Sequence, residues 1–169
     1  MNAISFNTSM TFAYGEAQPM VPGVARIVAN NPGFLTFKGT NTYLVGDASL
    51  AVIDPGPEDA AHRAAILSAA AGRPITHIVS THAHRDHVDG IAALKAATGA
   101  LVCAYKRKPA DVIPLERTPQ GREFIDLALD PDMVLYDGAR IAGEDWTLTA
   151  IHTPGHAPDH LCFALDGSG

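Results

Sequence analysis

Short apolar runs recur along the chain, and glycine, proline, asparagine or aspartate residues separate most of them. Runs of this length with turn residues at their ends are typical of β-strands. The strands expected from this pattern cover residues 24–29, 42–45, 50–53, 75–80, 101–104, 133–136, 146–151 and 161–165. Alanine-rich runs over residues 58–71 and 88–98 predict helices, because a glycine follows each and acidic residues open the first.

This alternation of strands and helices predicts an α/β fold with both helices on one face of the sheet. Two stretches lack the pattern. Residues 1–23 are interpreted as an irregular N-terminal segment, and the proline-rich, charged residues 106–131 as a long loop excursion. A chain of 169 residues is a typical length for one domain, so we expect residues 1–169 to form a single domain.

Composition excludes several classes of protein. With 47% hydrophobic and 18% charged residues, the chain is globular rather than disordered. A net charge of −6 predicts no attraction to duplex nucleic acid or to a membrane surface. No run is long and apolar enough for a membrane span, and the N-terminus lacks signal-peptide features, so we expect a cytoplasmic protein. The basic run 106–108 is interpreted as a solvated loop, with contact to an anionic substrate as the alternative.

The two cysteines, Cys103 and Cys162, each lie in an apolar run with the character of a strand. No Cys-x-x-Cys spacing occurs, which argues against a metal or redox motif. We therefore interpret both as buried free thiols.

Six of the eight histidines lie in two short windows of sequence. In the first window, His82 and His84 are two residues apart, so an extended loop would present both imidazoles on one side. Asp86 and His87 follow where the next helix is expected to begin. Neutral imidazole and carboxylate are ligands for zinc and similar ions, and α/β folds place ligand-handling loops after their strands. The window therefore predicts a metal-binding loop.

The second window follows the strand expected at 146–151 and contains His152, His156 and His160. Pro154 and Gly155 form a sharp turn that could bring His156 over the first window. A tetrahedral zinc held by two imidazoles still needs another protein ligand. His156 is the candidate for that position, whereas His152 is interpreted as a residue at the end of a strand.

Together these motifs resemble those of a known family. His-x-His-x-Asp-His at 82–87 followed by Thr-Pro-Gly-His at 153–156 is similar to the metallo-β-lactamase superfamily. The resemblance covers residues 24–166, apart from the loop excursion. It implies an αβ/βα sandwich, of which this chain would contain the first part.

Upstream motifs narrow the resemblance to one branch. Asn-Pro-Gly at 31–33, the stretch Gly-Thr-Asn-Thr-Tyr-Leu-Val-Gly at 39–46 and Ile-Asp-Pro-Gly at 53–56 resemble the beta-lactamase-like protein 2 branch. Glyoxalase II-type thioesterases are nearby relatives of that branch.

The positions that match the family's motifs indicate which residues would be metal ligands. His82, His84 and His156 would bind the first zinc ion, and Asp86 and His87 would contribute to the second.

The resemblance also implies roles beyond ligation. Asp86 would act in catalysis, orienting the attacking water or receiving its proton. Asp54 and His160 would support the site without touching the metal.

The superfamily supplies two further ligands, a bridging aspartate and a last histidine, that have no counterpart here. Asp166 lies too early to be the bridging aspartate. We therefore expect the chain to be an N-terminal fragment of a longer protein, with the second half of the sandwich truncated. We expect it to hold about one zinc ion where the intact enzyme holds two, and to self-associate through an uncovered sheet edge.

The function implied by the closest branch is zinc-dependent hydrolysis by a metal-activated water, with single-stranded RNA as the substrate. Resemblance to glyoxalase II implies instead a small-molecule ester or thioester, such as a glutathione thioester. A third alternative is that the isolated chain is a non-catalytic metal-binding half-domain. Serine-hydrolase and phosphate-loop motifs are absent from the sequence.

Overall fold

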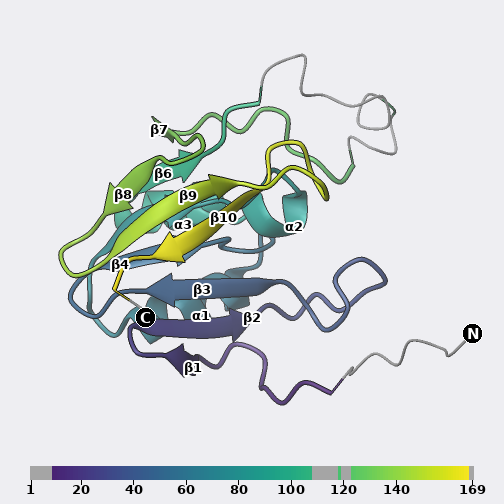
Figure 1. The fold of residues 1–169 in the computed structure, drawn as a ribbon. Helices are drawn as coiled ribbons and strands as arrows, with labels where there is room; N and C mark the ends of the chain where they lie inside the picture. The colour runs from purple at the N-terminus through teal and green to yellow at the C-terminus, as the bar shows by residue number, and fades with distance from the viewer. Residues whose placement is uncertain (1–8, 108–117, 119–122, 168–169) are drawn as a thin grey trace, which may run out of the picture.

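The computed structural model describes residues 9–107, 118 and 123–167, and its strands form two sheets (Figure 1). The seven-stranded sheet follows chain order and comprises β1 (Gln18–Val21), β2 (Val24–Val28), β3 (Asn41–Val45), β4 (Leu50–Ile53), β5 (Ile75–Val79), β6 (Leu101–Ala104) and β7 (Met133–Val134). The three-stranded sheet has the order β10-β9-β8, from β8 (Arg140–Ala142), β9 (Thr147–His152) and β10 (Leu161–Leu165).

The large sheet is mixed. Strands β1 to β4 pair antiparallel, whereas β4 to β7 pair parallel. Parallel neighbours need crossover connections, and helix α1 (Ala60–Ala70) provides the one between β4 and β5. Helices α2 (Arg85–Val88) and α3 (Ile91–Thr98) provide the next one. In Figure 1 the helices lie behind the large sheet and the small sheet lies in front of it.

Two apolar cores hold these layers together. Between the helices and the sheet, Val52 and Ile78 pack with Ile66 of α1 and Leu94 of α3. Between the two sheets, the core includes Val45, Ile53, Val79, Trp146, Leu148 and Leu161. Strand β4 is buried along its whole length because its side chains enter both cores in alternation. The predicted α/β fold with both helices on one face is confirmed.

The helices begin and end differently from the prediction. Helix α1 begins at Ala60, and Asp59 caps it by accepting hydrogen bonds from the backbone amides of Ala61 and His62. The run predicted as one helix from residue 88 is interrupted before Ile91. The interruption coincides with Gly90, where an added Cβ would lie 3.0–3.1 Å from three carbonyl oxygens of residues 55–57.

Three further expectations need correction. The irregular segment predicted over residues 1–23 is wrong at β1, whose exposed residues pair with β2. Strand β8 was not predicted. Both cysteines are free, but Cys162 is exposed and only Cys103 is buried.

The predicted loop excursion is described only in part. Described residues between 123 and 131 form turns and one isolated bridge, between Ile125 and His84. None of the helices in the described part of the chain has the length and apolar character needed to cross a membrane.

Candidate metal centre

Loops at one end of the two sheets bring three of the predicted ligands together. His82 and His84 lie between β5 and α2, and His156 lies in the connection from β9 to β10 (Figure 1). One nitrogen of each imidazole lies within 4.8 Å of the other two. His82 is buried, His84 is half-buried and His156 is exposed, so the group opens to solvent on the side of His156.

The spacing of these nitrogens suits one metal ion with small adjustments. Nε2 of His82 lies 2.7 Å from Nδ1 of His84, and Nε2 of His156 lies 3.0 Å from the same Nδ1. Bonds of about 2.0–2.1 Å to a tetrahedral zinc separate ligand nitrogens by about 3.3 Å. In both of these pairs, the two nitrogens need to separate by only a few tenths of an ångström to accept the ion.

The hydrogen bonds around Thr81 determine which nitrogen of His82 can bind a metal. The Thr81 hydroxyl donates its only hydrogen to Asp54 Oδ2 at 2.7 Å. Toward His82 Nδ1, at 2.8 Å, the same oxygen can therefore only accept. Nδ1 of His82 carries the proton, and Nε2 presents its lone pair to the other two histidines.

Burial keeps two of these imidazoles neutral. Burial, followed by the nearby histidines His87, His84, His156 and His160, lowers the pKa of His82 to about 2. Burial and the proximity of His156 also lower the pKa of His84, although Asp86 acts in the opposite direction. Neutral imidazole is the form that binds a metal.

Asp86 and His87 lie beside the three-histidine group, in α2. The ring centroids of His82 and His87 are 4.3 Å apart. Asp86 Oδ2 accepts a hydrogen bond from the Thr40 hydroxyl at 2.7 Å and lies 3.4 Å from His87 Nε2. That Asp86 and His87 bind a second ion stays a prediction.

Asp54 lies next to the histidine group, and it contacts Thr81 and His87. Its role in supporting the site stays a prediction. Asp54 has a left-handed backbone, with φ of 53°, and its side chain is buried. Its carboxylate accepts from the amide and hydroxyl of Thr81 and from His87 Nδ1. Burial lowers the pKa of His87, but the hydrogen bond and charge of Asp54, with the charge of Asp86, outweigh it, so the pKa is raised overall.

The remaining histidines differ in position. His160 lies near the group, with its ring centroid 5.3 Å from that of His82, and its Nδ1 contacts the Thr153 hydroxyl. His152 lies further out, where Nε2 donates to the Pro158 carbonyl and the ring stacks on Tyr105.

Two contacts of the site were not predicted from sequence. The Thr40 hydroxyl binds Asp86, and the Asp159 carboxylate accepts from the amide of Ala83. Thr40 lies in the Gly-Thr-Asn-Thr stretch and Asp159 lies inside the second histidine window, but neither motif specifies the partner of its residue. The interpretation of residues 106–108 as a solvated loop is wrong at Arg107, whose side chain is buried against Asp159.

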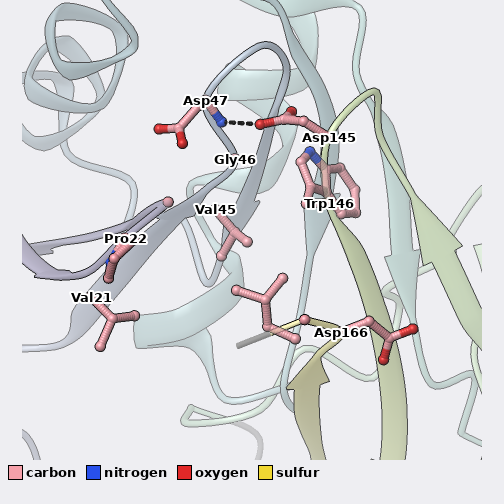
Figure 2. Close-up of a pocket in the computed structure, with 11 residues that line it drawn as sticks. Val21, Pro22, Val45, Gly46, Asp47, Asp145, Trp146 and Asp166 are labelled. Carbon is pink, nitrogen blue, oxygen red and sulfur yellow. Dashed lines mark hydrogen bonds between the residues drawn. The ribbon is translucent and has the colours of Figure 1, made fainter. Parts of the chain in front are cut away.

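A separate cavity of about 470 Å³ lies at the far end of β10 from these histidines (Figure 2). Its lining combines apolar residues with three carboxylates, Asp47, Asp145 and Asp166. Asp145 accepts a hydrogen bond from the backbone amide of Asp47 at 2.6 Å, which joins two turns. Because none of the predicted site residues lines this cavity, the histidine group remains the candidate centre.

Residues 35–169 match the sequence profile of the Metallo-beta-lactamase superfamily. The chain belongs to this superfamily. A lactamase-like protein of Pestalotiopsis microspora is 34% identical to it over 89% of the chain and 42% of its own length. An atrochrysone carboxyl ACP thioesterase of Passalora fulva is 33% identical over 91% of the chain and 42% of its own length.

The fold of this superfamily member also matches a solved structure. The crystal structure of BJP-1, a subclass B3 metallo-beta-lactamase of Bradyrhizobium japonicum, superposes with a TM-score of 0.69. The match covers 93% of this chain and 60% of that one at 24% identity, so it supports the fold alone. The chain spans less than half the length of the curated relatives described above.

Proposed function

We propose that this chain carries the first metal centre of a zinc-dependent hydrolase that cleaves acyl thioesters. The observation that carries the proposal is the convergence of His82, His84 and His156 within 4.8 Å, with the Nε2 lone pair of His82 directed into the group. Three imidazole ligands that leave one position open are the donor set of a catalytic rather than a structural zinc site.

Each polar residue of the site has a defined part in this proposal. The three histidines would hold the ion, which when bound supplies a water that ionises near neutral pH and a positive charge opposite the developing oxyanion. Asp86 lies beside them with its carboxylate fixed by Thr40, so it can orient the attacking water or receive its proton. Asp54 sets the orientation of His87 through Nδ1.

The substrate class is proposed from the relatives and from one surface feature. Two relatives are named thioesterases, the atrochrysone carboxyl ACP thioesterase of Passalora fulva and a thioesterase of Emericella nidulans. The loop from β2 to β3 ends at Thr40, which contacts Asp86, and it exposes Phe34 fully and Leu35 and Phe37 by more than half. Exposed apolar residues on a loop whose end contacts the polar centre suit an acyl chain or aromatic ring attached to the scissile thioester.

The test measures thiol release from an acyl thioester by the zinc-loaded protein, in the longest form that can be expressed. Single-stranded RNA and a β-lactam serve as competing substrates, and His84→Ala serves as the matched variant. We expect thioester cleavage that depends on zinc and falls at least 100-fold in the variant, because metal activation of water is lost.

Other outcomes would change the proposal in defined ways. Cleavage of RNA without thioester hydrolysis would favour the beta-lactamase-like protein 2 branch, which remains a prediction. Zinc binding without turnover on any substrate would favour the non-catalytic half-domain. Absence of zinc at the three histidines would overturn the metal centre itself.

A further inference from the structure

A buried carboxylate joins the two histidine windows. Asp159 is 2% exposed, and its Oδ2 accepts a hydrogen bond of 2.8 Å from the backbone amide of Ala83. Its Oδ1 lies 3.6 Å from Nε of Arg107, whose side chain is 7% exposed. Burying a charged pair is unfavourable until its interactions compensate for the lost hydration, so stability alone is a weak explanation for this arrangement.

The partner of Asp159 lies between two predicted ligands. Ala83 separates His82 from His84, and its side chain is buried. Its amide donates to Asp159 and its carbonyl accepts from the backbone amide of Asp126 at 2.8 Å. Both polar backbone groups of Ala83 are therefore held by residues that are distant in sequence.

The backbone next to His84 is restrained in the same way. The amide of Arg85 donates to the carbonyl of Phe124 at 2.8 Å, and His84 forms an antiparallel bridge with Ile125. Part of the predicted loop excursion thus lies along one side of the histidine loop. Asp159 holds the loop from the side of the second window.

From these contacts we infer that Asp159 is a positioning residue for the metal centre. It fixes the peptide between His82 and His84, so that both imidazoles are preset to face one point. Asp159 lies three residues after His156, so the loop that supplies the third imidazole also fixes the first two. The inference rests on the proposed metal centre and assigns Asp159 no contact with the ion.

The experiment compares Co²⁺ affinity and the visible Co²⁺ spectrum of the 169-residue chain and its variants. We expect Asp159→Ala to weaken binding by about 10–100-fold, the usual effect of removing a group that orients a ligand. Asp159→Asn keeps an acceptor for Ala83 but loses the charge that faces Arg107, so we expect a loss of several-fold. Hydrogen exchange at the backbone amide of Ala83 in the metal-free protein should be fastest in Asp159→Ala, slower in Asp159→Asn and slowest in wild type.

The matched control is Asp132→Ala. Asp132 also accepts from a backbone amide, that of Val102, and pairs with a cation, Lys95, but it lies away from the histidines. It should leave the Co²⁺ affinity unchanged, whatever it does to thermal unfolding. A purely structural role for Asp159 would make the two sites behave alike.

Each result decides between defined alternatives. Wild-type affinity and spectrum in Asp159→Ala would overturn the inference. If that variant does not fold, Asp159→Asn decides alone, with a several-fold loss supporting the inference and unchanged affinity overturning it. If the wild-type chain itself gives no Co²⁺ spectrum of a three-histidine site, the proposed centre fails, which is a different result from failure of the Asp159 inference.

Discussion

Asp54 Oδ2 lies 2.8 Å from Nδ1 of His87, and the same oxygen accepts from the hydroxyl of Thr81. Through Thr81 it sets the tautomer of His82, and directly it sets that of His87. A single buried carboxylate therefore determines which nitrogens of two neighbouring imidazoles remain free to bind a metal. The left-handed backbone of Asp54 is consistent with a residue held in position by its surroundings.

Replacing Asp54 with Asn should lower the pKa of His87 in the metal-free protein. The hydrogen bond and charge of Asp54 raise that pKa against the effect of burial, and the substitution removes the charge. NMR titration of His87 in wild type and variant measures the change, with His77, which has no contact with Asp54, as an internal control. An unchanged or higher pKa of His87 in Asp54→Asn would contradict this assignment.

The metal-free protein should lose stability as the pH falls below the ordinary histidine pKa of about 6.5. Burial lowers the pKa of His62, His77, His82, His84 and His160 in the folded state, so the unfolded chain binds more protons below that pH. His87 acts in the opposite direction: its raised pKa gives stability that is present at low pH and is lost as the pH rises through the folded pKa.

More of these histidines have a lowered pKa than a raised pKa, so acid should destabilise the fold overall. Between pH 6 and pH 5, each histidine that stays neutral contributes a loss of about 1.4 kcal/mol per pH unit at most. Urea unfolding of the metal-free protein at pH 7, 6 and 5 measures the trend. A free energy of unfolding that is flat or rises toward pH 5 would show that the buried imidazoles do not dominate.

Alanine at His82, His84 or His156 should each remove tight zinc binding, because each change leaves only two imidazoles. We expect affinity to fall by at least 100-fold, measured by competition with a chromogenic chelator. His77→Gln is the control, since His77 packs on Trp146 away from the group. Near-wild-type affinity in any of the three alanine variants would remove that residue from the ligand set.

Local patterns in the sequence predicted the strands whose apolar runs end in turn residues, such as β4 and β10. They did not predict β1, because Gln18 and Pro19 interrupt the apolar pattern and the whole strand is exposed. The spacing of the histidines in the first window predicted that His82 and His84 converge, because these residues are close together in sequence. The contacts of Thr40 with Asp86 and of Asp159 with Ala83 join residues 46 and 76 positions apart, so no local pattern could specify them.

The two free cysteines should differ sharply in reactivity. Burial and the proximity of Asp132 raise the pKa of Cys103 to about 11, and its side chain is inaccessible, whereas Cys162 is exposed. Iodoacetamide at pH 8 should therefore label Cys162 in the native protein and reach Cys103 only after unfolding, as peptide mass spectrometry can show. Labelling of both at equal rates in the native state would mean that the core between the two sheets opens readily.

The outer edge of β10 should make the chain self-associate in a concentration-dependent way. In the described part of the chain, β10 pairs only with β9, and its order in the small sheet leaves the other edge without a partner strand. Such an edge presents a row of backbone amides and carbonyls that can pair with a second molecule.

Ala164 is exposed on this strand, so Ala164→Lys adds a charge that disfavours edge-to-edge pairing without entering either core. Sedimentation velocity at several concentrations should show association in wild type and a shift toward monomer in the variant. The control is Ser68→Lys, on an exposed position of α1 away from the edge, which should associate like wild type. Association that is equal in all three proteins would place the contact elsewhere on the molecule.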